Sequence, residues 1–412
     1  MRKRVGIIGG GAAGLFAACQ LKRLSCDLDV TLIDKNPIPG KKLILTGHGR
    51  CNITNRKTPE KLKNCYHEAG NFIYPALKEF SPEDTIYFFE NELNLKTKEE
   101  DNNRIFPVCD SAVAVRDRLV SYISSDVAVI GEANVQSIEK TTDFEVVTSK
   151  GTYKFDYLIL SCGGRSFPKT GSTGDSYRFA EELGHTIVPT RGALAPVKAD
   201  DASVGFCRNL SGVSVKAGVS LFENEKKTAS AEGDILFAEF GLSGPAIMEI
   251  SREVSARLEG KNAFLEIDLI PSMSDEDFSK ELQNLINSHP DMKIATILSK
   301  FVPASVAGEI TQVAGCGGLY AQGFTKENRK NLCRETKHLK IGLSEVPDIR
   351  IAYVTRGGVS LKEVDRKTMG SKIVPNLYIL GEALDIDGIS GGFNLQACMS
   401  EAYLAAKDIV NK

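Results

Sequence analysis

The sequence predicts an α/β fold in which a parallel sheet flanked by helices is interrupted by an inserted domain. Residues 4–34 alternate strand, glycine turn, helix and strand. The chain ends on another strand, glycine-rich turn and helix, and the sequence between them changes to short strands followed by helical segments. We therefore expect a first domain over residues 1–190 and 355–412 and an inserted domain over residues 191–354.

The first strand leads directly into a glycine-rich turn. Gly9, Gly11 and Gly14 form the pattern G-x-G-x-x-G after the predicted strand 4–8, and Asp34 ends the next strand 20 residues later. In a Rossmann-type βαβ unit, such glycines let the main chain approach a pyrophosphate at a helix N-terminus, and the acidic residue binds a ribose. The pattern predicts a dinucleotide site that includes Ala12 and Ala13, and by itself it does not separate FAD from NAD.

The other elements follow from periodicity and from turn residues. Residues 37–63 are polar and lack periodicity, which predicts a long ordered loop or a segment that covers a ligand. Residues 127–160 predict a small antiparallel meander whose last run returns to the parallel sheet. The inserted domain should begin with short strands and contain a helical part at about 245–320, broken by Pro290 and Pro303. A final strand, 376–381, precedes a helix that begins near Asn394.

Composition and charge exclude several classes of protein. The 51 Lys and Arg residues against 53 Asp and Glu residues give a net charge of −2, so we expect no nucleic-acid partner. The ten cysteines contain no C-x-x-C pair, which favours reduced thiols in a cytoplasmic protein and no metal site. The basic start and the apolar run after it could suggest a secretory signal, but five glycines between residues 6 and 14 argue against one. No other stretch reaches the roughly 18 apolar residues of a membrane span, so we expect no membrane partner.

Six further motifs occur in order over nearly the whole chain, namely KKLILTGHGRCNITN (41–55), RIFP (104–107), GGRSFPKTGSTGD (163–175), FGLSGPAI (240–247), VTRGGVS (354–360) and GGFNLQA (391–397). Together they resemble the HI0933-like family of flavoproteins. The resemblance implies a Rossmann-type FAD-binding domain, similar to that of glutathione reductase, with an inserted β-barrel-like and helical domain. It also implies tightly bound, non-covalent FAD.

The resemblance further implies where the cofactor binds. Adenine would lie near Val135, the ADP ribose on Asp34 and Lys35, and the isoalloxazine near Asn394 and Leu395. A helix that starts after residues 391–393 would direct main-chain N–H groups at the flavin edge where negative charge collects on reduction. The remaining candidates for cofactor binding are Lys41, Lys42, Thr46, Arg50, Cys51, Asn52, Gly163, Gly164, Gly381, Glu382 and Asp387. Which of Glu382, Asp385 and Asp387 contacts the ribityl chain stays open.

Several of these residues have a plainer interpretation. Lys41 and Lys42 could be solvated surface charges. Without a second cysteine at redox spacing, Cys51 is better read as a packed thiol near the flavin. His48 has no mechanistic partner in the sequence, and Arg356 is equally suited to a substrate contact and to a structural ion pair. No catalytic residue is assigned.

The expected reaction is a flavin-dependent oxidation or reduction. With only one G-x-G-x-x-G in the chain, NAD(P)H would be a transient electron donor. The family resemblance favours a reductase that acts on a conjugated enone, such as the 3-oxo-4,6-diene of a bile acid intermediate. An FAD-dependent oxidase of aminoacetone or a similar amine, and a non-catalytic flavin-dependent redox sensor, are the alternatives. The substrate would be a small hydrophobic molecule or an amine, and the oligomeric state stays open.

Overall fold

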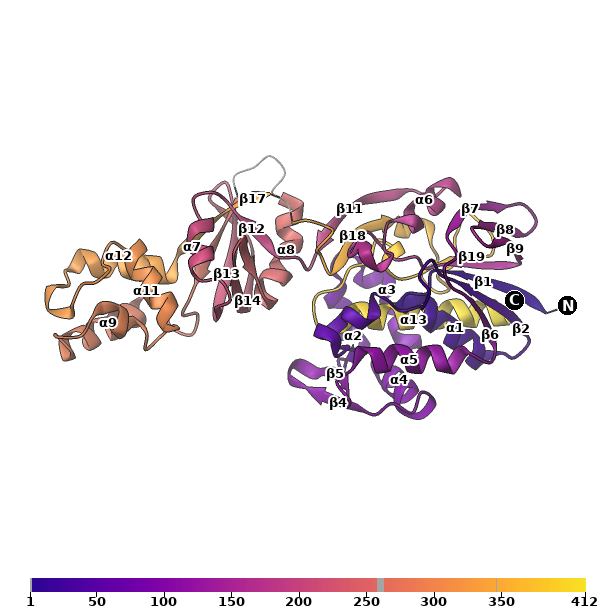
Figure 1. The fold of residues 1–412 in the computed structure, drawn as a ribbon, viewed down its shortest axis with the longest axis horizontal. Coiled ribbons are helices and arrows are strands. Elements are labelled where there is room, and N and C mark those ends of the chain that lie inside the picture. Colours follow the sequence, from indigo (N-terminus) through magenta and orange to yellow (C-terminus); the bar gives the residue numbers. More distant parts are fainter. Residues whose placement is uncertain (1, 258–262, 346) are drawn as a thin grey trace. The chain divides into compact units, whose positions relative to one another are not determined.

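The computed structural model describes residues 2–257, 263–345 and 347–412, and the chain divides into two compact units (Figure 1). Unit 1 comprises residues 1–191 and 354–412, and unit 2 comprises residues 192–353. Each unit has its own hydrophobic core. A parallel-sheet unit together with a unit built from an antiparallel barrel and helices is the fold class that the sequence predicts.

A five-stranded parallel sheet forms the centre of unit 1. Its strand order is β19 (Leu377–Ile379), β10 (Tyr157–Leu160), β1 (Lys3–Ile8), β2 (Leu28–Ile33) and β6 (Val127–Ile130). Every neighbouring pair is parallel, so the carboxyl ends of all five strands lie on one edge of the sheet. The strand β10 is apolar and buried along its whole length, and β1 is so from Val5 to Ile8, because both faces of the sheet are covered.

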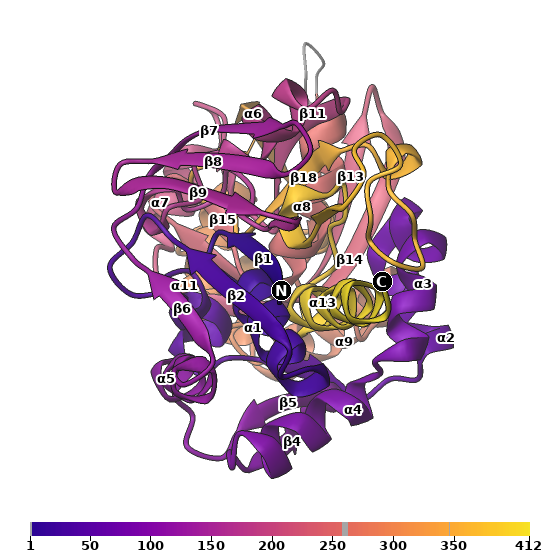
Figure 2. The same ribbon diagram turned by 90° about the vertical axis from the view of Figure 1, so that its right-hand side faces the viewer.

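Helices cover one face of this sheet. The helix α1 (Ala12–Leu24) follows the glycine turn and packs against α5 (Ala112–Ile123) and α13 (Phe393–Asn411). The helix α13 also lies beside α3 (Gly70–Glu79), as Figure 2 shows. The N-termini of α1 and α13 are both preceded by glycines, and both helices begin after the carboxyl end of a sheet strand.

A small antiparallel sheet adjoins the parallel one. It contains β7 (Val135–Lys140), β8 (Phe144–Thr148) and β9 (Gly151–Phe155), as the sequence predicts for this region. The prediction was wrong for the first run of the meander, because residues 127–130 form β6, which pairs in parallel with β2. That run follows α5 and completes another crossover connection, a feature that strand periodicity alone does not reveal.

The segment predicted as a loop, residues 37–63, contains short elements. The other elements of unit 1 are η1 (Leu43–Gly49), β3 (Thr54–Asn55), α2 (Pro59–Leu62), η2 (Lys63–Ala69), α4 (Pro82–Tyr87), η3 (Phe88–Glu92), β4 (Thr97–Glu100), η4 (Asp101–Asn103), β5 (Arg104–Pro107), η5 (Pro168–Thr170), α6 (Asp175–Glu182), β11 (Ile187–Ala193), β18 (Val354–Val359), η7 (Leu361–Glu363) and η8 (Gly381–Ala383).

Unit 2 contains a closed antiparallel barrel and a group of helices. The barrel order is β12 (Val197–Ala199), β15 (Gly241–Ser243), β14 (Lys226–Ala238), β13 (Ser214–Glu223), β16 (Ala263–Asp268) and β17 (Leu339–Glu345). Inward and outward side chains alternate along β16, as a filled barrel requires. The helix α8 (Pro245–Arg257) packs on β13 and β14. After β16 come α9 (Asp275–Ser288), α10 (Ile294–Leu298), α11 (Ala304–Val313), η6 (Ala321–Gly323) and α12 (Lys326–Lys337), and α7 (Val204–Asn209) precedes β13.

Candidate cofactor-binding site

The three glycines of the turn after β1 have different roles. Gly9 has a φ of +98°, and a Cβ there would lie 2.6 Å from the Cα of Cys162. A Cβ on Gly14 would lie 1.9 Å from the Gly9 carbonyl oxygen, so both residues must be glycine for the protein itself to fold. A Cβ on Gly11 would meet no atom within 4 Å. Gly11 therefore borders open space, which is where the pyrophosphate of a dinucleotide would approach the main chain.

Asp34, at the end of β2, braces this turn. Its side chain is 8% exposed, and its two carboxylate oxygens accept hydrogen bonds from the N–H groups of Gly10 and Asn36, both at 2.6 Å. Each oxygen keeps lone pairs for a ribose hydroxyl. Lys35 instead donates to Asp175 at the start of α6, at 2.6 Å. The Asp34 carboxylate is thus held in a fixed orientation at the carboxyl edge of the sheet.

A lysine and a glutamate meet at the carboxyl ends of β10 and β19. The Nζ atom of Lys42 lies 2.8 and 2.9 Å from the carboxylate oxygens of Glu382 and 2.6 Å from the Ser166 hydroxyl. A Cβ on Gly164 would lie 2.3 Å from Thr355 Oγ1 and 3.0 Å from Glu382. Three of the motifs that are distant in sequence therefore converge here. Ser166 and Thr355 lie inside these motifs, although sequence reasoning did not single them out.

The loop between Lys42 and β3 is fixed mainly by contacts within the protein. The Arg50 guanidinium binds Glu100 at 2.8 and 2.9 Å and lies 4.1 Å from the centroid of the Phe106 ring. Thr46 donates a hydrogen bond to a main-chain carbonyl of the same loop. Cys51 is buried, and burial raises the pKa of its thiol to about 12. Cys51 is therefore a thiol at neutral pH and lacks the thiolate that redox or nucleophilic chemistry needs.

The N-terminus of α13 is held by side chains from distant segments. Gly392 is the N-cap residue of the helix and has a φ of +92°. In the orientation of the Asn52 amide that satisfies its hydrogen-bonding neighbours, the amide oxygen accepts a hydrogen bond from the N–H of Gly392 at 3.1 Å. Asn394 bonds both main-chain groups of Gly388, at 2.8 and 2.9 Å. The first turn of α13 contains no acidic side chain. Its N–H groups and the positive end of its dipole are therefore left for a negatively polarised ligand.

A buried hydrogen-bond network around Gln396 fixes the first turn of the same helix. Gln396 accepts hydrogen bonds from the hydroxyls of Thr54 at 2.5 Å and Thr85 at 2.9 Å, and it donates to the Phe80 carbonyl at 3.1 Å. These bonds tie α13 to β3 and α4. They fix the helix N-terminus against the loop that carries Asn52.

Glu401 is a buried carboxyl group that the sequence analysis missed. It lies on α13 with no exposed area, and one oxygen accepts from the N–H of Gly381 at 2.6 Å. Its other oxygen, Oε1, has no hydrogen-bond partner among the described residues. Burial raises the pKa of this carboxyl to about 8. A glutamate inside the apolar run ACMSEAYLAA is the signal that could have identified it.

The remaining predicted residues lie around the same sheet edge. The segment before Val135 bonds to the main chain of Asp34, which brings β7 beside the end of β2. Gly163 follows β10 with a φ of +73°, and Gly381 follows β19 with a φ of +67°. Asp385 accepts a hydrogen bond from the N–H of Gly357, and Asp387 is buried, with its Oδ2 atom 3.9 Å from Nε2 of His67. Lys41 and His48 are exposed, and Leu395 is half-buried on α13. Arg356 has a buried Nη1 atom without a hydrogen-bond partner among the described residues.

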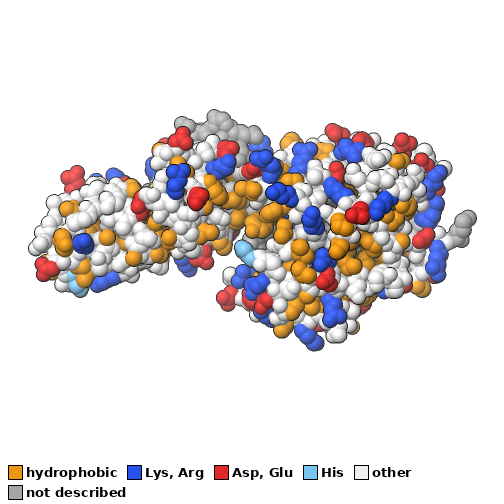
Figure 3. Space-filling model, viewed as in Figure 1, with side chains coloured by type: hydrophobic (Ala, Val, Ile, Leu, Met, Phe, Trp, Pro, Cys, Tyr) orange, Lys and Arg blue, Asp and Glu red, His pale blue; other side chains and the backbone are white. Residues whose placement is uncertain are grey.

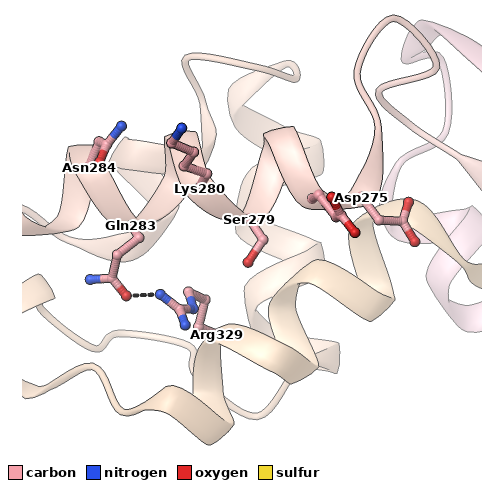
Figure 4. Close-up of a pocket in the computed structure, with 7 residues that line it drawn as sticks. Asp275, Ser279, Lys280, Gln283, Asn284 and Arg329 are labelled. Carbon is pink, nitrogen blue, oxygen red and sulfur yellow. Dashed lines mark hydrogen bonds between the residues drawn. The ribbon is translucent and has the colours of Figure 1, made fainter.

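A polar surface groove lies elsewhere, on the helices of unit 2 (Figure 4). Arg329 of α12 reaches across it to Gln283 of α9. None of the predicted cofactor residues lines it. The described residues contain no cluster of three side chains suited to a metal ion, and none of the described helices is long and apolar enough to cross a membrane. The groove between α9 and α12 is lined by Asp275, Glu276, Ser279, Lys280, Gln283, Asn284 and Arg329.

Residues 3–408 match the family described as HI0933-like protein Rossmann domain. The chain belongs to this family. This HI0933-like protein is 29% identical to a 3-dehydro-bile acid Δ(4,6)-reductase of Clostridium scindens over 98% of both chains. It is 30% identical to a ribosomal RNA dihydrouridine synthase of Escherichia coli over 98% of this chain and 97% of that one. A ribosomal RNA dihydrouridine synthase of Haemophilus influenzae is 29% identical over the same shares.

The fold of the HI0933-like protein also has solved counterparts. A 3-ketosteroid Δ1-dehydrogenase of Sterolibacterium denitrificans superposes with a TM-score of 0.54, 14% identity and 99% coverage of each chain. The predicted family and fold class are confirmed, and the chain is a flavin-dependent oxidoreductase with an α/β FAD-binding fold. The open space at Gly11, the buried carboxylate of Asp34 at the end of β2 and the uncompensated α13 N-terminus fit FAD. Two of these relatives modify ribosomal RNA, which argues against the expectation of no nucleic-acid partner that was drawn from the net charge.

Proposed function

We propose that this chain reduces a carbon–carbon double bond conjugated to a carbonyl group, with hydride passed from NAD(P)H through FAD. The observation that carries the proposal is the chemistry common to its relatives. A Δ(4,6)-reductase of a 3-dehydro-bile acid acts on a ketone with conjugated double bonds. Conversion of uridine to dihydrouridine saturates a ring double bond conjugated to a carbonyl. Both are two-electron reductions of an α,β-unsaturated carbonyl.

The reaction balances with one hydride and one proton. NAD(P)H loses hydride and becomes NAD(P)⁺, and the substrate gains hydride at its β-carbon and a proton at its α-carbon. Bound FAD supplies a centre that accepts hydride from one partner and donates it to the other. During the second transfer, negative charge develops on the carbonyl oxygen. A hydrogen-bond donor at that oxygen lowers the barrier.

Residues of the chain suit the supporting roles. The free N–H groups at the start of α13 would hold the flavin edge that becomes negative on reduction. Lys42 and Glu382 would orient the ribityl chain from the ends of β10 and β19. Arg356 is the best candidate for the donor at the carbonyl, because its buried Nη1 atom has no partner among the described residues and an unpaired buried donor is costly. The adjoining Thr355 and Gly357 tie this strand to the Ser166 and Asp385 segments.

An anaerobic titration in two half-reactions tests the proposal. The purified flavoprotein is reduced with NADH or with NADPH, and the loss of oxidised-flavin absorbance is followed. A 3-oxo-4,6-diene steroid is then added to one sample and ribosomal RNA from cells that lack the gene to another. Return of the oxidised spectrum, with a saturated product identified by mass spectrometry, supports the proposal.

The same titration distinguishes the alternatives. If the flavin stays reduced with both substrates and is reoxidised only when air is admitted, the reductase proposal fails. Turnover of an amine with oxygen would then favour the oxidase. If neither nicotinamide reduces the flavin, the proposed electron donor is wrong, and dithionite-reduced protein tests the second half-reaction alone.

A further inference from the structure

The net charge of the chain hides an uneven distribution. Over the face of unit 1 seen in Figure 3, basic and acidic side chains are interspersed. Residues 35–63, however, contain eight Lys and Arg residues and a single acidic one, Glu60. This segment runs from the end of β2 to η2, directly past the candidate cofactor site. This segment therefore gives the surface beside the site a local excess of positive charge.

Seven of these eight cations fall into two groups, and the exposed Lys41 is in neither. Lys35, Lys42, Arg50 and Arg56 each have a carboxylate oxygen within 3.2 Å and are neutralised by the fold. In contrast, three lysines of the α2 and η2 region and one on α3 have no carboxylate oxygen within 4.0 Å of Nζ among the residues that the structure describes. We call this second group the lysine surface: Lys57, Lys61, Lys63 and Lys78.

Aromatic rings orient the lysine surface. Lys63 and Lys78 lie 5.3 and 5.7 Å from the centroid of the same Tyr74 ring. The half-buried Tyr74 and the exposed Lys78 are one turn apart on α3. Lys61 and Lys78 are exposed, and Lys57 and Lys63 are half-buried. The ammonium groups are kept at the surface with no carboxylate oxygen within 4.0 Å among the described residues, although Glu60, which accepts a hydrogen bond from the Tyr74 hydroxyl at 3.1 Å, attracts Lys78 at longer range.

The lysine surface adjoins the N-terminus of α13. Lys57 lies 5.1 Å from the centroid of the Phe393 ring, and Phe393 is the first residue of α13. Within the same region, Tyr66 donates to the Phe393 carbonyl at 2.8 Å, and the N–H of Ile389 donates to the Cys65 carbonyl at 3.0 Å. The lysine surface and η2 therefore lie beside the turn before α13, where the flavin edge would lie.

We propose that the lysine surface binds the phosphate backbone of a single-stranded RNA segment and so presents a uracil ring to the cofactor site. The inference rests on the proposed function, and of the two substrate classes named there, a steroid enone and RNA, it selects RNA. Lysines without a salt bridge beside the half-buried Tyr74 ring match the chemistry of a single strand, whose phosphates need positive charge and whose bases can stack on an aromatic side chain. A steroid has no phosphate for these lysines to bind. Its reduction without RNA binding is therefore the contrary outcome.

Binding of a labelled single-stranded oligouridine to the FAD-loaded protein tests the proposal. Fluorescence anisotropy is measured over a series of salt concentrations for the wild type and for the triple variant Lys57→Gln, Lys61→Gln, Lys63→Gln. Loss of three phosphate contacts should weaken binding and flatten the slope of log affinity against log salt by about 2, from about 0.7 per contact. The matched control changes three lysines of the β7–β9 region, Lys140→Gln, Lys150→Gln and Lys154→Gln, and should bind like the wild type.

The outcomes separate this proposal from the proposed function. If the triple variant binds with wild-type affinity and slope, or if the wild type does not bind while it reduces a steroid enone, the lysine surface is not an RNA site. If the control variant loses as much affinity as the triple variant, binding is nonspecific and the proposal also fails. If the RNA binds through the lysine surface but neither substrate is reduced, the proposed function fails and the binding surface stands. Reduction of the flavin by NAD(P)H should be equal in all three proteins.

Discussion

Glu401→Gln should remove a large pH dependence from the stability of the protein. Burial gives the Glu401 carboxyl a pKa of about 8 in the folded state, against an ordinary value of 4.5. The folded protein therefore holds a proton that the unfolded chain releases between these two values. The stabilising contribution is fully present below about pH 4.5 and is lost as pH rises to about 8. The difference corresponds to about 5 kcal/mol of folding free energy at most.

Urea unfolding at a series of pH values between about 5 and 8.5 measures this effect. The glutamine side chain cannot ionise and can still accept the hydrogen bond from Gly381, so the variant should lose the downward slope and become more stable than the wild type at the alkaline end. Glu182→Gln, an exposed carboxyl in an i,i+4 pair on α6, is the control and should leave the slope unchanged. An unchanged slope in Glu401→Gln would refute the reasoning, because another group would then hold the proton.

Three further predictions concern packing and reactivity. Gly14→Ala should prevent stable folding, measured by circular dichroism and thermal unfolding, since the new Cβ would lie 1.9 Å from a main-chain oxygen. Gln396→Leu should destabilise the protein by several kcal/mol in urea unfolding, because the Thr54 and Thr85 hydroxyls lose their acceptor at about 1–3 kcal/mol each, while the Phe80 carbonyl keeps the Ser400 hydroxyl. Iodoacetamide should label the exposed Cys26 and Cys109 in the native protein but not Cys51, as peptide mass mapping would show, and rapid labelling of Cys51 would contradict its burial.

Much of unit 1 could be predicted from the sequence because its signals are local. The strand, the three glycines and Asp34 lie within 34 residues, and each has a geometric requirement that fixes its spacing. The β6 strand was misplaced for the opposite reason. Its four residues have the same periodicity in a meander and in a parallel sheet, and only the α5 crossover decides between them.

The contacts that shape the candidate site could not be predicted in the same way. Lys42 meets Ser166 and Glu382 because the segments that follow β10 and β19 lie on one edge of the sheet, and the pair of Lys42 and Glu382 joins residues 340 positions apart. Thr355, from the separate strand β18, joins this group by bonding Ser166. The sequence also could not show that Arg50 is engaged by the β4 carboxylate Glu100, whereas the lysine surface is left without one. Charge counted over the whole chain hides that distinction.

Flavin retention by Gly11→Val tests the central claim most directly. The claim is that FAD is held with its pyrophosphate over the turn after β1, and Gly11 is the turn glycine whose Cβ would meet no protein atom within 4 Å. The variant should therefore keep the circular dichroism spectrum and the unfolding midpoint of wild-type protein stripped of flavin. Wild-type protein should release FAD on denaturation in a ratio near one per chain, and the variant should release none. A folded Gly11→Val protein that purifies yellow and fully loaded with FAD would contradict the placement of the cofactor.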